Sequence, residues 1–335
     1  MQKNKIIIIA EAGVNHNGDI KLARELIAVA ADAGANYVKF QTFDADKLVT
    51  NDAPTANYQK QNTQYLEQKS MLKSLELSYS SYDELINFAK QKNIGFLTTA
   101  FDLNSLYFVN KLKTDFFKIP SGEITNTPYL KVVGSFKKRI ILSTGMSYLG
   151  EIETALDTLK KAGTSEKNIV LMHCTSEYPA PLDEVNLAVM KTLKQCFGVS
   201  VGYSDHTLGI NIPIAAAAMG ASIIEKHFTL NKNLEGPDHK ASLSPEEFKN
   251  MVLSIREVEK AIGSPRKMVT KSEFDNRNVV RKSIVAKTFI RKGDVFSDDN
   301  LTTKRPGTGI SPIYLEEIIG KKARRSFKED DLIDI

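Results

Sequence analysis

Short apolar runs alternate along the chain with longer segments in which apolar residues recur every three or four positions. The short runs predict eight strands, at Ile6–Ala10, Tyr37–Phe40, Gly95–Thr98, Phe116–Ile119, Ile140–Leu142, Ile169–Met172, Val199–Gly202 and Ile223–Glu225. The longer segments predict helices, at Ile20–Ala33, Tyr82–Lys92, Ser105–Leu112, Pro128–Ser135, Gly150–Lys161, Asp183–Cys196, Ile210–Met219 and Pro245–Ile262. Such alternation is typical of a parallel sheet.

Eight repeats favour a closed (β/α)8 TIM barrel of the α/β class over an open sheet. A doubly wound sheet is the alternative, but no Gly-rich dinucleotide loop follows the first strand. The connection from Thr42 to Ser81 is long and polar, and such loops usually have a function, for example as a lid. We expect the barrel to occupy residues 1–263, a polar linker residues 264–279, and a second small domain residues 280–335.

The composition is that of a globular protein, with 42% hydrophobic and 25% charged residues among 335. No apolar stretch reaches the ~18 residues that a membrane span needs, and the apolar run near the amino terminus is too short for a signal peptide. Two cysteines, Cys174 and Cys196, suggest a reducing compartment, so we expect a cytoplasmic protein.

The net charge of +5 arises from residues 264–335, where 16 Lys and Arg interleave with 11 Asp and Glu. This mixture indicates a solvated surface, with neither nucleic acid nor a membrane as partner.

Polar residues cluster where the predicted strands end, which is where parallel barrels carry their catalytic side chains. Two of them, Lys39 and Lys118, lie near serines and threonines and indicate a site for an anion such as a phosphate-bearing substrate. Each lysine could instead pair with a buried carboxylate.

His206 and His227 follow neighbouring strands and form a plausible pair of ligands for a divalent metal. Two ligands alone leave positions open for water and a substrate oxygen. The alternative is a pair of hydrogen-bonding core histidines. We expect His173 to pack within the barrel and His16 to form hydrogen bonds in a loop near its mouth.

Several ordered motifs resemble those of the sialic acid synthase family, which includes bacterial nonulosonic acid synthases such as legionaminic acid synthases. They are residues 10–18 (AEAGVNHNG), 38–42 (VKFQT), 117–123 (FKIPSGE), 142–146 (LSTGM), 173–175 (HCT), 203–207 (YSDHT), 225–229 (EKHFT) and 236–238 (GPD). Residues 304–310 (KRPGTGI) resemble the signature of that family's carboxyl-terminal domain, an antifreeze-like (SAF) domain.

The resemblance implies condensation of phosphoenolpyruvate with an open-chain, N-acetylated mannose-type sugar, which yields a nine-carbon 2-keto acid and phosphate. N-acetylmannosamine, the acceptor of an N-acetylneuraminate synthase, is the first expectation. The alternative is 2,4-diacetamido-2,4,6-trideoxymannose, the acceptor of an N,N'-diacetyllegionaminate synthase. Residues 175–181 (TSEYPAP) depart from some sialic acid synthases and are closer to the legionaminic acid synthases.

The resemblance also implies roles for individual residues. His206 and His227 would hold Mn2+, or else Mg2+ or Co2+, and Glu11 would be the acid or base, with Glu123 beside it. Arg305 would enter the active site of the partner subunit in a domain-swapped homodimer. For substrate binding it implies Lys39, Thr99, Lys118, Ser121 and Ser143 for phosphoenolpyruvate, and Gln41, Tyr178 and Asp238 near the sugar. Ser176 and Ser204 are further candidates from their place at the predicted strand ends.

Two functions of other classes remain open at this point. A metal-dependent barrel aldolase would use the same histidine pair without needing the anion site, so release of inorganic phosphate discriminates against it. A carbohydrate-binding or ice-binding role of residues 280–335 would leave the polar strand ends without a purpose.

Overall fold

The computed structural model describes residues 5–63, 65 and 67–335. These form two compact units, residues up to Gly263 and residues from Ser264 onward. The first unit is a closed barrel of eight parallel strands in sequential order, with the first strand paired to the last. This confirms the predicted TIM barrel. The strands are β1 (Ile7–Gly13), β2 (Tyr37–Thr42), β3 (Gly95–Ala100), β4 (Phe117–Ile119), β5 (Ile140–Ser143), β6 (Ile169–His173), β7 (Ser200–Asp205) and β8 (Ile223–His227).

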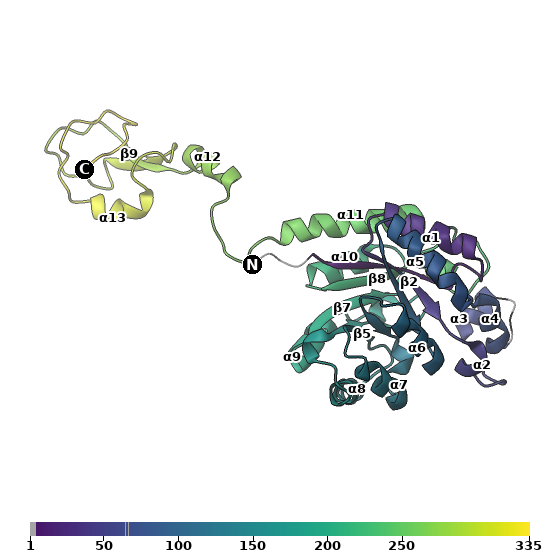
Figure 1. Ribbon diagram of the computed structural model, residues 1–335. Coiled ribbons are helices and arrows are strands. Elements are labelled where there is room, and N and C mark those ends of the chain that lie inside the picture. The colour runs from purple at the N-terminus through teal and green to yellow at the C-terminus, as the bar shows by residue number, and fades with distance from the viewer. Residues whose placement is uncertain (1–4, 64, 66) are drawn as a thin grey trace. The chain divides into compact units, whose positions relative to one another are not determined.

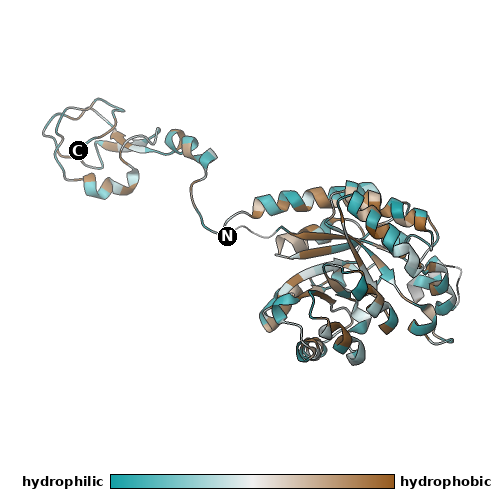
Figure 2. Cartoon of the chain, in the orientation of Figure 1, coloured by the Kyte–Doolittle hydropathy of each residue, from teal (hydrophilic) through white to brown (hydrophobic). Residues whose placement is uncertain are grey.

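The helices that follow the strands lie around the barrel, and α11 shows alternating hydrophobic and hydrophilic stretches (Figures 1 and 2). They are α1 (Ile20–Asp32), α5 (Tyr82–Gln91), α6 (Leu103–Lys111), α7 (Thr127–Ser135), α8 (Leu149–Ala162), α9 (Val189–Phe197), α10 (Asn211–Ala218) and α11 (Pro245–Ile262). As expected, α11 begins at Pro245, and Ser244 is its N-cap. Ser244 Oγ accepts from Glu247 N at 3.3 Å, and Glu247 Oε2 accepts from Ser244 N at 2.7 Å, which is a capping box.

The two-residue period of the strands determines which side chains enter the barrel. Ile8, Ala10 and Ala12 of β1 pack outward in the main core against the helices, whereas Ile9 faces inward with Leu97, Ile141 and Ile223. Two residues beyond each of these inward apolar side chains stands a polar one: Glu11, Thr99, Ser143 and Glu225 line the cavity at the carboxyl ends of the strands. The barrel is therefore apolar at one end and polar at the other.

The connection between β2 and β3 differs from the predicted loop, because it folds into short helices. These are α2 (Ala45–Leu48), α3 (Asn57–Asn62) and α4 (Gln68–Leu75), followed by a 3-10 turn at Tyr79–Ser81. Apolar residues of α4 have a buried side and pack with Phe43 and Val14 in a small separate core. We call residues 43–81 the β2–β3 insertion.

The second unit contains a two-stranded antiparallel sheet, β9 (Ser283–Ala286) and β10 (Leu301–Lys304), and the short helix α13 (Leu315–Ile318). Its own small core includes Ile284, Phe296 and Phe327. The predicted linker, residues 264–279, is not without structure. The helix α12 (Lys271–Val280) forms there, with Thr270 and Glu273 in a capping box. This Thr-x-x-Glu motif was visible in the sequence, but the polarity of the stretch masked it, since no residue of α12 is buried.

Among the described residues no helix is long and apolar enough to cross a membrane. Cys174 is buried and Cys196 is exposed, and both are free thiols.

Candidate active site

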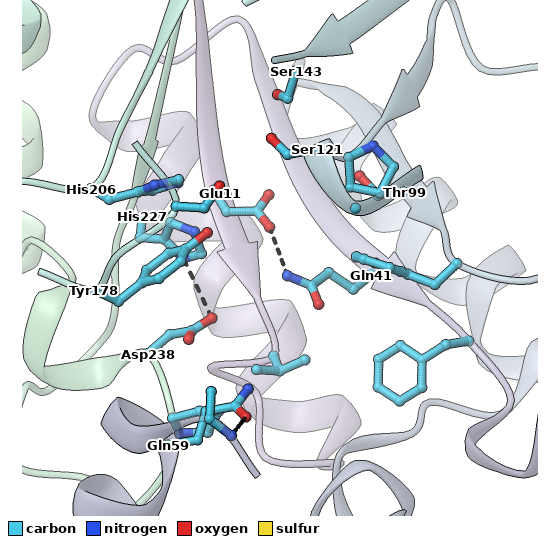
Figure 3. Close-up of a pocket in the computed structure, with 18 of the residues that line it drawn as sticks. Glu11, Gln41, Gln59, Thr99, Ser121, Ser143, Tyr178, His206, His227 and Asp238 are labelled. Atoms are coloured by element: carbon cyan, nitrogen blue, oxygen red, sulfur yellow. Dashed lines mark hydrogen bonds and ion pairs between the residues drawn. The ribbon is translucent and has the colours of Figure 1, made fainter. Parts of the chain in front are cut away.

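A cavity of about 560 Å³ opens at the carboxyl ends of the barrel strands. Figure 3 shows Glu11 of β1, His227 of β8 and His206, which follows β7, converging there with side chains from other strands. The structure brings together in its lining every barrel residue that the sequence analysis proposed, namely Glu11, Lys39, Gln41, Thr99, Lys118, Ser121, Glu123, Ser143, Ser176, Tyr178, Ser204, His206, His227 and Asp238.

Two lysines and two glutamates alternate on the floor of this cavity, and all four are almost completely buried. Lys39 Nζ lies 2.6 Å from Glu11 Oε2 and 3.6 Å from Glu225 Oε1, and Lys118 Nζ lies 3.3 Å from the same Glu225 oxygen. Glu225 also accepts a hydrogen bond of 3.3 Å from Ser204 Oγ. The predicted alternative, that the lysines pair with buried carboxylates, is thus correct, but both ammonium groups also line the open cavity.

Glu225 was missing from the predicted site, although it precedes His227 by two residues and so faces the same way. Because Glu225 has two lysine partners and Glu11 has one, the pKa values of these two carboxyl groups differ. Burial raises the pKa of Glu11 to about 7, because desolvation outweighs the attraction of Lys39. Burial acts on Glu225 in the same direction, but Lys118 and Lys39 together hold its pKa below the usual value. Glu11 is therefore the carboxyl group suited to exchange a proton near neutral pH.

The backbone also shapes the surroundings of Glu11. The register between β1 and β2 shifts between Glu11 and Gly13, and Gly13 has a φ of +55°. A Cβ at this glycine would lie 3.3 Å from both Glu11 Oε1 and Gln41 Nε2. Gln41 Nε2 donates to Glu11 Oε1 at 3.2 Å. Glycine therefore permits these two side chains to meet, which a larger residue would hinder.

Glu123 also lines the cavity, but its surroundings differ from those of Glu11. Its side chain is only half-buried, burial raises its pKa, and its Oε2 accepts from Asn126 Nδ2 at 2.6 Å. A catalytic role of Glu123 stays a prediction.

His206 and His227 lie side by side, with ring centroids 5.6 Å apart. His206 Nδ1 donates to the carbonyl oxygen of Thr175 at 2.5 Å, so its Nε2 carries a free lone pair. His227 Nδ1 is buried without a hydrogen-bond partner, 3.6 Å from Asp238 Oδ2. Burial lowers the pKa of His206 to about 4 and also lowers that of His227. Two neutral imidazoles with available lone pairs fit a divalent metal.

No set of three or more His, Cys, Asp or Glu residues that could hold an ion occurs in the described part of the chain. A metal held by the two histidines would therefore have to complete its coordination with water or substrate oxygens.

The remaining histidines of the chain have structural partners. His173 Nε2 donates to the carbonyl oxygen of Val185 at 2.7 Å, and His16 Nδ1 accepts from Gly18 N at 3.0 Å. Both agree with the sequence analysis. His239 Nδ1 shares a hydrogen bond of 2.7 Å with Thr229 Oγ1.

Hydroxyl groups gather on the other side of the cavity. Ser121 Oγ accepts from Gly145 N at 3.0 Å, and Lys39 Nζ donates to Thr99 Oγ1 at 3.1 Å. Ser143 Oγ is buried without a partner. A Cβ at Gly145 would lie 2.2 Å from Ser176 Oγ, so glycine keeps this hydroxyl-lined space open. The donors and the two lysines together are able to bind an anion.

The side that carries Tyr178 and Asp238 offers polar groups for a second ligand. The Tyr178 ring lies against His206, with centroids 4.1 Å apart, and burial raises the pKa of Asp238 to about 6. Arg305 belongs to the second unit, where its side chain is exposed and its Nε donates to the Val280 carbonyl oxygen at 3.0 Å.

A buried ion pair stands directly behind the two histidines, on the outward face of β7 and β8. Lys226 Nζ lies 2.5 Å from Asp205 Oδ2, both side chains are fully buried, and the two residues are partners in the strand register. Lys226 Nζ also donates to the Thr207 carbonyl oxygen. His206 directly follows Asp205, and His227 directly follows Lys226. The ion pair therefore fixes the backbone that carries both imidazole rings.

Comparison with known proteins agrees with this geometry. The NeuB family matches residues 26–267, and the SAF domain matches residues 281–334. The N,N'-diacetyllegionaminic acid synthase of Campylobacter jejuni is 56% identical, over 98% of this chain and 99% of that protein. The enzyme of the same name from Legionella pneumophila is 48% identical, over 94% of this chain and 89% of that protein.

A solved structure is also similar over most of the chain. The N-acetylneuraminic acid (sialic acid) synthetase of Leptospira borgpetersenii matches with a TM-score of 0.73 and 34% identity, over 82% of this chain and 90% of that one. The predicted resemblance is thereby confirmed along both units, and the chain belongs to the NeuB family.

Proposed function

We propose that this protein is an N,N'-diacetyllegionaminic acid synthase, which condenses phosphoenolpyruvate with 2,4-diacetamido-2,4,6-trideoxymannose and releases phosphate. The observation that carries the proposal is the single cavity in which an anion site with two lysines adjoins two neutral histidines. N-acetylmannosamine was the first expectation for the acceptor. The relatives at 56% and 48% identity favour the alternative, because both are named for the diacetylated product.

In this proposal, the phosphate and carboxylate of phosphoenolpyruvate bind to Lys39, Lys118 and the hydroxyl groups around Ser143. Glu225 holds the two ammonium groups at one place before the substrate arrives, since it contacts both. Such preorganisation reduces the rearrangement that the charges must make when the anion binds.

His206 and His227 would hold the metal, for which Mn2+ is the first candidate and Mg2+ or Co2+ are alternatives. When bound, the ion draws electron density from the aldehyde group of the acceptor and favours attack at its carbon. Asp238 and Tyr178, with Gln41 across the cavity from them, orient the sugar.

The bonds change in a defined order. The π electrons of the C2=C3 bond of phosphoenolpyruvate form a bond from C3 to the aldehyde carbon, the C=O π pair moves onto the aldehyde oxygen, which takes up a proton, and C2 becomes electron-poor. Water then adds at C2, and Glu11, with a pKa of about 7, takes its proton. The C2–O bond to phosphate breaks, and phosphate leaves with the electron pair. The C2 hydroxyl group loses its proton as the C2=O bond forms, so the two protons of the water end on the former aldehyde oxygen and on phosphate, and the 2-keto acid remains.

The test is release of inorganic phosphate from phosphoenolpyruvate with Mn2+ and each acceptor in turn. We expect the highest kcat/KM with 2,4-diacetamido-2,4,6-trideoxymannose and little release without a sugar. A higher kcat/KM with N-acetylmannosamine would instead support the first expectation, an N-acetylneuraminate synthase. Sugar turnover without phosphate release would indicate a metal-dependent barrel aldolase.

We also propose a domain-swapped homodimer in which Arg305 serves the partner's barrel. The support is the family resemblance and the exposure of Arg305 on the second unit. The experiment mixes His227→Ala and Arg305→Ala chains, each inactive alone, under subunit exchange. Swapping pairs an intact barrel with an intact Arg305 in one of the two heterodimer sites, so activity should return. Inactive heterodimers would show that Arg305 does not act across the interface.

A further inference from the structure

The cavity has one wall that neither phosphoenolpyruvate nor the metal needs. Seven apolar side chains line it, and four of them form a buried cluster while the other three pack against that cluster. Five of them belong to the β2–β3 insertion, and the other two, Val14 and Phe101, directly follow β1 and β3. We call them the insertion wall: Val14, Phe43, Leu48, Met71, Leu72, Leu75 and Phe101.

The insertion lies away from the anion site. Figure 3 shows Ser143 and Ser121 toward one end of the cavity and Gln59, which belongs to α3 of the insertion, at the opposite end, with Glu11 and the two histidines between them. Asn62 Nδ2, also in α3, donates to the Pro237 carbonyl oxygen at 3.2 Å, next to Asp238. The insertion therefore adjoins the part of the cavity where the proposed function places the sugar.

This arrangement sets the direction of the acceptor. If the aldehyde carbon lies at the histidine pair and faces phosphoenolpyruvate, the rest of the sugar chain must extend away from Ser143. The end that carries C6 then points toward the insertion. In 2,4-diacetamido-2,4,6-trideoxymannose this end is a methyl group, and an acetamido methyl group lies nearby on C4.

We propose that the insertion wall is the specificity subsite that receives the C6 methyl and the C4 acetamido methyl of the acceptor and discriminates against N-acetylmannosamine. This inference rests on the proposed function. N-acetylmannosamine would place hydroxyl groups at C4 and C6 against hydrocarbon, where they lose water without gaining hydrogen-bond partners. Apolar pockets typically distinguish ligands that differ by one such group by about 10- to 200-fold in kcat/KM.

The test replaces two wall residues singly, Leu48→Gln on α2 and Leu72→Gln on α4. Both side chains are only half-buried, so a polar group can be accommodated without emptying the core, and glutamine is a good helix former. Because the two lie on different helices, each checks the other if one variant folds poorly. Leu253→Gln on α11 is the matched control, since Leu253 is 52% exposed and does not line the cavity.

We expect each wall variant to lower the ratio of kcat/KM for the trideoxy acceptor to that for N-acetylmannosamine by about 10-fold. The KM for phosphoenolpyruvate should stay unchanged, and Leu253→Gln should keep the wild-type ratio. A loss of activity that is equal for both acceptors would reduce the wall to structural support and overturn the inference. So would an unchanged ratio in both well-folded variants.

The wild-type enzyme separates this failure from that of the proposed function. If the wild type releases phosphate with neither sugar, the proposed function itself is wrong, whatever the variants do. If the wild type prefers the trideoxy sugar and the variants keep that preference, the proposed function stands and the subsite lies elsewhere.

Discussion

Lys226→Met tests whether the ion pair behind the two histidines holds the barrel together. Methionine has nearly the shape of the lysine stem, so the change removes the charge and little volume. Asp205 would keep its hydrogen bonds from Tyr203 Oη at 3.0 Å, Thr207 N at 3.2 Å and Thr207 Oγ1 at 3.1 Å. It would lose the ammonium group at 2.5 Å, in surroundings where both side chains are fully buried.

Removing one partner of a buried pair typically lowers the free energy of unfolding by 3–5 kcal/mol, because it leaves a charge without compensation. The three remaining donors to Asp205 place the expected loss at the lower end, about 3 kcal/mol. Asp205→Asn should cost a similar amount, since Lys226 is then buried without its counter-ion. The double variant should cost at least ~2 kcal/mol less than the sum of the two single variants, because it contains no unpaired charge.

The assay is urea unfolding of the four proteins, followed by circular dichroism in the far ultraviolet. The protein has no tryptophan, and most of its helices belong to the barrel unit, so this signal reports chiefly on the barrel. The reasoning is refuted if Lys226→Met costs less than ~1 kcal/mol, or if the two substitutions are additive to within ~0.5 kcal/mol.

Further predictions concern pH, the anion site and the metal. All five histidines lie buried in the barrel with lowered pKa values, so stability present above the unfolded-state pKa of about 6.5 is lost as the pH falls toward 4. The raised pKa values of Glu11 and Asp238 act in the opposite direction and offset part of this loss. The urea midpoint of the metal-free protein should still fall between pH 6 and pH 5; a flat midpoint would contradict this. Lys118→Ala and Lys39→Ala should each raise the KM for phosphoenolpyruvate about 10- to 150-fold and that for the sugar much less, and steady-state kinetics with each substrate varied would show otherwise if the lysines serve only the fold. His227→Ala should abolish Mn2+ binding in calorimetry, and chelation should stop wild-type turnover reversibly; full activity in excess chelator would exclude the proposed metal role.

The sequence by itself determined the order of elements and the direction in which their side chains point. The alternation of strand and helix follows from local periodicity. Because residues two apart in a strand point to the same face, Glu11 must face the same side as Ile9. Because all strands of a parallel barrel end on the same side, the polar strand ends had to share one cavity. For the same reason the polar residues at the strand ends could be found without coordinates, whereas Asp238 and the roles of individual residues came from the family resemblance.

Only the tertiary structure decided which of these groups touch. Closure of the barrel pairs β1 with β8 and sets Glu11 beside His227, and the pairing of β1 with β2 sets Glu11 beside Lys39. Both contacts join residues that are distant in the sequence. The same closure places Glu225 between two lysines and leaves Glu11 with one, which separates their pKa values. Desolvation and charge act through space, so no local pattern could reveal this difference. The insertion wall likewise depends on short helices, whose burial against Val14 and Phe43 comes from packing and not from their own polar sequence.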